Sequence, residues 1–283
     1  MKTRIISGIV MGAIVAAVLA LGFLWNSIVI TLAIALIAAV AVYELLHNAA
    51  GIKSKPALIG ACLYAFLNVI VNDYKSAQYV LDLVFPQGIK AVPIFSAIGL
   101  CLGILYFIFA VVMVLKNHKD FGLGQIATLC GMPSVLVILF VYLNSVIGNA
   151  DGIYYLLLLL NFSSVCDMGA YFTGVTCGKH KLCPNISPKK TVEGAIGGVV
   201  SSIIVTLIIT LCFGKTIWLP LVLTIPLCIL GMIGDLFASA IKRSVNLKDY
   251  GSLIPGHGGI LDRVDSIIMI VPLMYLMIKF GIL

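Results

Sequence analysis

Nine apolar segments, each close to the length needed to cross a membrane, dominate the sequence. A helix requires roughly 20 apolar residues to span the hydrocarbon core of a bilayer. Within each segment the apolar residues are continuous and do not alternate with polar ones, which favours helices over a transmembrane barrel. The sequence therefore predicts an all-α polytopic integral membrane protein with about nine transmembrane helices, at residues 5–25, 27–47, 56–72, 92–115, 124–146, 153–176, 193–213, 219–241 and 262–281. Residues 73–91 leave room for a short interfacial helix.

The composition excludes the other broad classes of protein. Hydrophobic residues make up 61% of the chain and charged residues only 10%, whereas a soluble domain carries about 25% charged residues. So few charges cannot provide a polar surface, and disorder is excluded because it requires low hydrophobicity. The net charge of +7 does not indicate a nucleic-acid partner, because the basic residues lie between the apolar segments.

The distribution of basic residues predicts the orientation of the chain. If the N-terminus is cytoplasmic, 14 of the 18 lysines and arginines lie inside and four lie outside, namely Lys75, Lys90, Lys215 and Lys279. Cytoplasmic loops are enriched in Lys and Arg, so this asymmetry favours that orientation and an odd number of spans. The loops at 177–192 and 242–261 then face the cytosol. We accordingly expect a scaffold of N-terminal helices (1–123) and C-terminal helices (124–283) that carry these catalytic loops.

Five carboxylates lie inside the predicted spans or at their starts, all in the C-terminal half. Charge within a bilayer is costly and points to function; the five are Asp167, Glu193, Asp235, Asp262 and Asp265. Their shared position near the cytoplasmic side predicts one polar site. Other acidic residues are interpreted as solvated charges in loops or at span ends: Asp73, Asp82, Asp120 and Asp151. Glu44 lies near the cytoplasmic end of its span, where its side chain can reach water.

The loop at 177–192 combines basic residues with the start of a helix. Ser187 is a candidate N-cap, followed by Pro188 at the first helical position. The free N–H groups of such a turn, together with Lys189 and Lys190, predict an anion site. A positively charged cytoplasmic loop before a capped helix is the alternative explanation.

The last cytoplasmic segment joins carboxylates to cations. One helical face carries Asp235, Ser239, Lys242 and Arg243. Asp262 and Asp265 are one helical turn apart, and His257 lies in the intervening loop, where it is a candidate base only together with these neighbours. Carboxylates suit Mg²⁺ better than zinc, and Lys and Arg beside a bound metal suit phosphate. The pattern therefore predicts a metal-assisted phosphoryl or nucleotidyl transfer site.

The stretch from Ser239 to Asp265 resembles the signature of the phosphatidate cytidylyltransferases, also called CDP-diacylglycerol synthases. The matching positions are Ser239, Lys242, Arg243, Lys248, Asp249, Gly251, Ile254, Pro255, His257, Gly258, Gly259, Asp262, Arg263 and Asp265. Residues 167–174, which include Tyr171, and residues 187–194 also resemble motifs of that family.

This resemblance implies a reaction in which CTP and phosphatidic acid, a membrane lipid, give CDP-diacylglycerol and pyrophosphate. It also implies Mg²⁺, a second cation, a multi-span helical homodimer, and a bacterial-type cytoplasmic membrane with the active site facing the cytosol. The implied metal ligands are Asp235 and Asp262, supported by Asp265 and Asp167. The remaining expected catalytic residues are Lys242, Arg243, Lys248, Asp249, His257 and Arg263. The expected substrate-binding residues are Ser187, Lys189, Lys190, Thr191, Glu193, Ser239, Tyr171, Gly258 and Gly259.

Two other functions compete with this interpretation. A CTP-dependent polyprenol kinase would use a lipid alcohol and would need a base to activate it; the complete signature favours the cytidylyltransferase. An ion-coupled transporter would place its site near the bilayer midplane between inverted repeats. The charges here instead lie near one interface, and no repeat is visible in the sequence.

Overall fold

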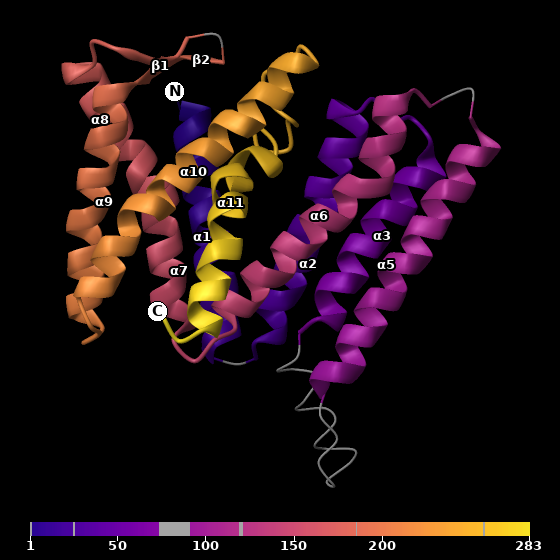
Figure 1. Cartoon of the computed structure of the whole chain (residues 1–283), viewed down its shortest axis with the longest axis horizontal. Coiled ribbons are helices and arrows are strands. Elements are labelled where there is room, and N and C mark those ends of the chain that lie inside the picture. Colours follow the sequence, from indigo (N-terminus) through magenta and orange to yellow (C-terminus); the bar gives the residue numbers. More distant parts are fainter. Residues whose placement is uncertain (1, 25, 74–90, 119–120, 185, 257) are drawn as a thin grey trace, which may run out of the picture. The chain divides into compact units, whose positions relative to one another are not determined.

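The computed structural model describes residues 2–24, 26–73, 91–118, 121–184, 186–256 and 258–283 (Figure 1). By packing, the chain divides into two compact units. The first unit comprises Met1–Asn144 and Asp249–Asp262, and the second comprises Ser145–Lys248 and Arg263–Leu283. The division expected after residue 123 concerns the roles of the helices and stays a prediction.

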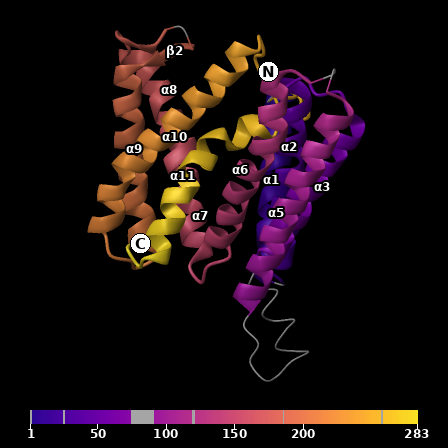
Figure 2. The same ribbon diagram turned by 45° about the vertical axis from the view of Figure 1, so that its right-hand side comes forward.

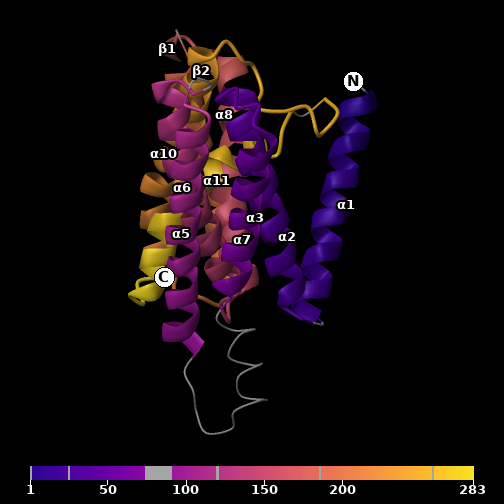
Figure 3. The same ribbon diagram turned by 90° about the vertical axis from the view of Figure 1, so that its right-hand side faces the viewer.

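The first unit is built from long apolar helices. They are α1 (Lys2–Leu24), α2 (Ile28–Tyr43), which continues into a π-helical turn η1 (Glu44–Ala49), α3 (Lys55–Val71), α5 (Ala91–Lys116) and α6 (Leu123–Ile147). Helix α2 packs against α1 and α3, and α3 packs against α5 (Figures 2 and 3). Small residues are buried along α2 and α3, and they let the two helices approach closely; they are Ala35, Ala38, Ala41, Ala57, Ala61 and Ala65.

The second unit contains the remaining helices and a small hairpin. Its elements are α7 (Gly152–Leu160), the π-helical turn η2 (Asn161–Val165), α8 (Cys166–Cys177), β1 (Lys181–Cys183), β2 (Ser187–Thr191), α9 (Val192–Cys212), α10 (Trp218–Ser244) and α11 (Leu261–Lys279). The first two residues of α11, Leu261 and Asp262, belong to the first unit. Strands β1 and β2 pair antiparallel, with Lys181 opposite Thr191 and Cys183 opposite Ser187. The hairpin connects α8 to α9 at one end of the unit (Figure 1).

A stripe of small and polar residues on α9 positions it against α8 and α10. Gly194 and Gly198 are buried on this stripe, and a Cβ at either position would lie within 2.6 Å of a carbonyl oxygen of α8. Further along the stripe, Thr206 Oγ1 accepts a hydrogen bond from Asn161 Nδ2 at 2.9 Å and lies 2.9 Å from Thr224 Oγ1 on α10. Such interhelical hydrogen bonds stabilise packing where lipid removes the hydrophobic driving force.

The predicted fold class is confirmed. Each of the nine predicted spans corresponds to a helix or a continuous helical run in the described part of the chain. Six of the described runs are long and apolar enough to cross a membrane: Ile28–Ala49, Ile94–Lys116, Leu123–Ile147, Gly152–Cys177, Val192–Cys212 and Trp218–Ser244. Gly12–Phe23 and Lys55–Val71 are shorter apolar helices. The two-stranded hairpin was not expected. The interfacial helix considered for 73–91 falls almost entirely outside the described residues.

One acidic residue was misassigned as a solvated charge. Asp73 is buried, and its Oδ2 accepts a hydrogen bond from Thr31 Oγ1 at 2.7 Å on α2. Asp151, by contrast, is half-exposed and pairs with Lys215 at 2.7 Å, and this hydrogen bond raises the pKa of Lys215 above its ordinary value. Asp82 and Asp120 lie outside the described residues. The error at Asp73 arose because its partner is 42 residues away in the sequence.

The two loops on either side of α10 provide a test of the predicted orientation. We expect Ser252 to face the cytosol and Lys215 to face the opposite side. The exposed native cysteines, Cys101, Cys177 and Cys212, are first replaced by alanine. Ser252→Cys should then react with an impermeant maleimide only in inside-out vesicles, and Lys215→Cys only in right-side-out vesicles. The reverse pattern would show that the orientation is inverted, and labelling of both from one side would refute the span count.

Candidate functional site

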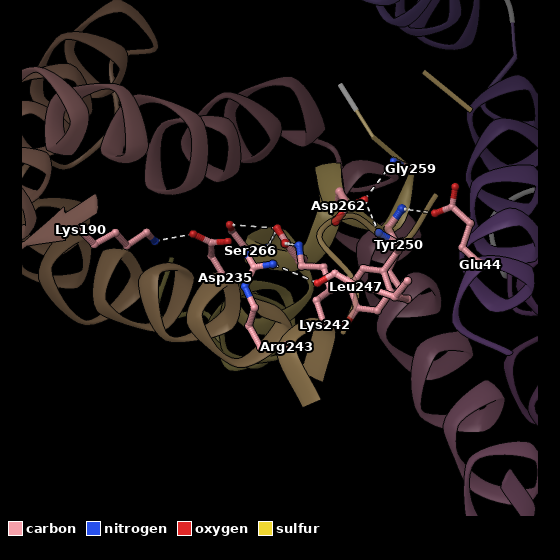
Figure 4. Close-up of polar contacts among 12 residues, drawn as sticks. Glu44, Lys190, Asp235, Lys242, Arg243, Leu247, Tyr250, Gly259, Asp262 and Ser266 are labelled. Carbon is pink, nitrogen blue, oxygen red and sulfur yellow. Dashed lines mark hydrogen bonds and ion pairs between the residues drawn. The ribbon is translucent and has the colours of Figure 1, made fainter. Parts of the chain in front are cut away.

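An ion pair joins the hairpin to α10 in the second unit. Lys190 Nζ donates to Asp235 Oδ2, and each side chain retains about a quarter of its accessible surface (Figure 4). Neighbouring strand residues point to opposite faces, and Lys189 is accordingly exposed while Lys190 turns inward. The strand therefore delivers one lysine to the carboxylate and leaves the other at the surface.

Asp167 adds a second carboxylate to this group. Its charged neighbours are Lys190, Asp235 and Arg263. Asp167 and Arg263 are exposed in the isolated chain. The second unit thus holds two carboxylates and two cations together, all with accessible surface. We call Asp167, Lys190, Asp235 and Arg263 the mixed-charge cluster.

A second, more buried pair lies farther along α10. Lys242 Nζ is 3.9 Å from Asp265 Oδ2 on α11, and each side chain is only 9% exposed. Asp265 Oδ1 also accepts the backbone N–H of Ser266 at 2.8 Å (Figure 4). The sequence placed Lys242 on the same face of α10 as Asp235. The carboxylate that Lys242 meets is Asp265 of α11. Arg243 is exposed and donates from Nη1 to the carbonyl of Leu247 at 3.0 Å, three residues beyond the end of α10.

The start of α9 differs from the prediction. Ser187 and Pro188 belong to strand β2, so they are neither the N-cap nor the first residue of a helix. Thr191 is the N-cap instead, and its Oγ1 accepts the N–H of Gly194 at 3.1 Å. The chain stays extended through Ser187 because β2 pairs with β1. The helix start expected at Ser187 is therefore wrong, and anion binding by this segment together with Lys189 and Lys190 stays a prediction.

Glu193 holds the hairpin to the start of α9. Its carboxylate accepts the N–H groups of Lys179 at 3.0 Å and His180 at 3.2 Å, and it lies 2.6 Å from His180 Nδ1. These contacts tie the segment before β1 to the first turn of the helix. The predicted role of Glu193 in substrate binding stays a prediction, and the observed contacts are local.

In the first unit, Asp262 orders the loop at 249–262. Its Oδ2 accepts the N–H of Tyr250 at 2.8 Å and that of Gly259 at 2.9 Å (Figure 4). Gly256 and Gly258 have φ of +77° and +83°, a region that favours glycine. The sequence predicted a metal ligand at Asp262; the structure gives this side chain a loop-ordering contact, and the ligand role stays a prediction.

The expectation that the Glu44 side chain reaches water is wrong. Glu44 is almost fully buried, with Oε1 accepting the N–H of Ile260 at 3.0 Å and Oε2 accepting that of Leu261 at 2.8 Å. The signal was present, because Glu44 is an acidic residue within an apolar segment, which is the rule that selected the other carboxylates. Its partners lie more than 200 residues away, so the sequence could not identify them.

The remaining candidates are placed as follows. Lys248 and Asp249 are exposed beside the buried Tyr250. Tyr171 is 66% exposed on α8, and Ser239 is half-buried on α10. His257 lies outside the described residues.

The donor set of the mixed-charge cluster fits a hard cation. Among the described residues, no three His, Cys, Asp or Glu side chains gather closely enough to form a metal site from protein alone. Magnesium, however, is commonly held by one or two carboxylates together with substrate phosphates and water. Asp167 and Asp235 supply two carboxylates, and Lys190 and Arg263 supply charge for a polyanion. Chemically, the arrangement can bind a phosphate ester together with a divalent cation.

Comparison with known proteins shows which family this chain resembles in sequence. Residues 2–281 match the sequence profile described as the cytidylyltransferase family. The chain is 33% identical to a phosphatidate cytidylyltransferase of Staphylococcus epidermidis over 282 residues, or 98% of this chain and 99% of the relative. It is 34% identical to that of Staphylococcus saprophyticus over 72% of this chain and 77% of the relative. A Staphylococcus haemolyticus relative is 42% identical over 132 residues, and there the chain spans about half (51%) of its length.

The revised start of α9 yields a stability prediction. Thr191→Val keeps the side-chain shape but removes the cap, which should cost about 1 kcal/mol. Ser187→Ala, in the strand, should change stability by less than about 0.5 kcal/mol. Unfolding in detergent micelles measures both variants. A larger loss in Ser187→Ala than in Thr191→Val would restore the original assignment of the cap.

Proposed function

This chain belongs to the cytidylyltransferase family, and we propose that it is a phosphatidate cytidylyltransferase that makes CDP-diacylglycerol and pyrophosphate from CTP and phosphatidic acid. One observation supports this most strongly: the similarity to a protein of that name extends over 98% of the chain. The mixed-charge cluster agrees with it, because both substrates are phosphate esters and need cations around them. A lipid kinase or an ion-coupled transporter has no comparable support.

In this reaction an oxygen of the lipid phosphate forms a bond to the α-phosphorus of CTP. The bond from that phosphorus to the bridging oxygen of the β-phosphate breaks, and the electron pair leaves with pyrophosphate. A phosphate monoester has a second pKa of about 6. The phosphate of phosphatidic acid is therefore largely ionised at neutral pH, and its attacking oxygen needs no strong base. Positioning and charge neutralisation are then the main tasks of the protein.

The residues of the cluster divide these tasks. Asp235 and Asp167 would hold Mg²⁺, which supplies charge neutralisation at the phosphate oxygens when bound. Lys190 pairs with Asp235 in this structure, and a polyanion entering the cluster offers the lysine a new partner. Arg263 is exposed nearby and can form two parallel hydrogen bonds to a phosphate. Lys242 is too buried to leave Asp265 readily, so we assign it to holding α10 and α11.

The membrane setting agrees with these substrates. The protein is a multi-pass membrane protein, with six described helical runs that are long and apolar enough to cross a bilayer. We propose that the hairpin end of the second unit faces the cytosol of a bacterial cell, where CTP is found and where the basic loops satisfy the positive-inside rule. The second cation and the homodimer implied by the family resemblance stay predictions.

The activity is tested by following two labels of CTP. With α-labelled CTP and phosphatidic acid, the purified protein should transfer label to lipid. With γ-labelled CTP it should not, because the γ-phosphate leaves in pyrophosphate. Removal of divalent cations with EDTA should abolish the transfer, and added Mg²⁺ should restore it. Transfer of the γ-label to lipid would indicate a kinase and overturn the proposal, and full activity after exhaustive chelation would refute the metal requirement.

The predicted ligand role of Asp262 is tested by Asp262→Asn. The asparagine carbonyl oxygen can still accept the N–H groups of Tyr250 and Gly259, so the loop should survive while the charge is lost. If Asp262 neutralises charge during the reaction, kcat should fall on the order of 10²–10⁴-fold, as for other lost electrostatic stabilisers.

Asp151→Asn is the matched control, because it removes a carboxylate from an exposed ion pair and should leave kcat unchanged. Asp73 is unsuitable as a control because it is buried and hydrogen-bonded. If Asp262→Asn kept more than about a tenth of the wild-type kcat at saturating Mg²⁺, a loss of only about 1.4 kcal/mol, Asp262 would be a structural residue.

A further inference from the structure

Glu44 makes a two-pronged contact with a distant part of the first unit. Its side chain is 3% exposed, and its two carboxylate oxygens accept one backbone N–H each, from Ile260 at 3.0 Å and Leu261 at 2.8 Å. The donors lie 216 and 217 residues further along the chain. Burying a carboxylate that lacks hydrogen-bond partners costs free energy. The two N–H donors therefore stabilise Glu44 in its buried position.

The two donors belong to the start of α11, which begins at Leu261. The first N–H groups of a helix have no partner within the helix, and a nearby side chain such as Ser or Asp usually satisfies them. Ile260 has no side-chain acceptor, so Glu44 supplies the cap from the first position of η1. Negative charge at a helix N-terminus is also favoured by the helix dipole.

The loop is shaped to receive this carboxylate. A Cβ at Gly251 would lie 2.9 Å from Glu44 Cδ, and one at Gly259 would lie 2.6 Å from the same atom. Both distances are shorter than real Cβ contacts, so a side chain at either glycine would displace Glu44. Gly251 and Gly259, which both belong to the signature that resembles the family, therefore make room for Glu44, which lies outside that signature.

A second contact comes from the next turn of the same helical run. Asn48 Nδ2 donates to the carbonyl of Tyr250 at 2.5 Å, and the N–H of Tyr250 donates to Asp262 Oδ2. Tyr250 is only 2% exposed. The backbone of Tyr250 is thus held at its carbonyl by Asn48 of η1 and at its N–H by Asp262. Glu44 and Asn48 both belong to the π-helical turn η1, and such turns often occur at functional sites.

We propose that Glu44 is a positioning residue that sets the conformation of the described residues of the loop Asp249–Asp262 and thereby the orientation of the Asp262 carboxylate. Figure 4 shows Glu44, Tyr250, Gly259 and Asp262 gathered at this loop. The inference rests on the proposed function, because Asp262 belongs to the signature that resembles the family. It adds a residue of η1, outside that signature, to those on which the reaction depends.

The variants are chosen to separate charge, length and general stability. Glu44→Gln keeps the size but can accept only one of the two N–H groups, since its amide nitrogen faces the other donor. Glu44→Asp keeps both acceptors and the charge on a shorter side chain. Thr31→Val is the matched control. Thr31 is buried on α2, which leads into η1, and the substitution removes its hydrogen bond to Asp73. The described hydrogen bonds of Thr31 are to Ser27, Asp73 and Asn144, and none of these residues belongs to the loop.

Two measurements test the positioning role of Glu44. Amide hydrogen exchange of the purified protein reports protection at Ile260 and Leu261 without requiring activity, and steady-state kinetics report kcat and KM for CTP. Glu44→Gln should speed exchange of these amides on the order of tenfold and lower kcat about 10- to 100-fold with little change in KM. Glu44→Asp should recover part of both losses. Thr31→Val should lower stability but leave exchange of the loop and kcat per folded molecule unchanged.

Each outcome decides one point. Unchanged exchange at Ile260 and Leu261 in Glu44→Gln would overturn the contact. Faster exchange with wild-type kcat, or an equal fall of kcat in Thr31→Val, would overturn the positioning role and leave Glu44 a structural residue. If the wild-type protein transfers no cytidylyl group, the proposed function fails and with it the kinetic part, while the exchange experiment still decides the contact.

Discussion

A carboxylate carried by an apolar helix has to be matched by a cation or by backbone N–H groups, and the buried and half-buried carboxylates of this protein meet that requirement in two ways. Asp235 is matched by Lys190 and Asp265 by Lys242, whereas Glu44 and Asp262 are matched by backbone donors of one loop. The two kinds of match have different consequences. A lysine on a hairpin can exchange its partner for a substrate phosphate, while backbone donors fix a loop in place.

The fold was largely predictable because the membrane imposes a length on each helix, and apolar segments of that length are visible in the sequence. Local capping was less predictable. Ser187 and Pro188 have the composition of a helix start, but pairing with β1 keeps them extended and moves the cap to Thr191. The burial of Asp73 and the contacts of Glu44 were missed for a different reason, since both depend on partners far away in the sequence.

The candidate site was predictable in its members but less so in their roles. The rule that charge in an apolar segment signals function selected Asp167 and Asp235, which share the mixed-charge cluster with Lys190 and Arg263. The same rule selected Glu193, whose contacts are with the segment just before β1. Composition therefore identifies costly residues, and only the packed structure separates those that present charge to a ligand from those that hold the chain.

The central claim is that Asp235, now paired with Lys190, is available to a divalent cation when CTP is present. Titration of the purified protein with Mn²⁺, followed by electron paramagnetic resonance, measures this directly. The account predicts that CTP promotes binding of Mn²⁺ to the wild-type protein and that Asp235→Asn weakens this binding at least about tenfold, equivalent to about 1.4 kcal/mol. Equal Mn²⁺ affinity of the wild type and Asp235→Asn in the presence of CTP would contradict the claim.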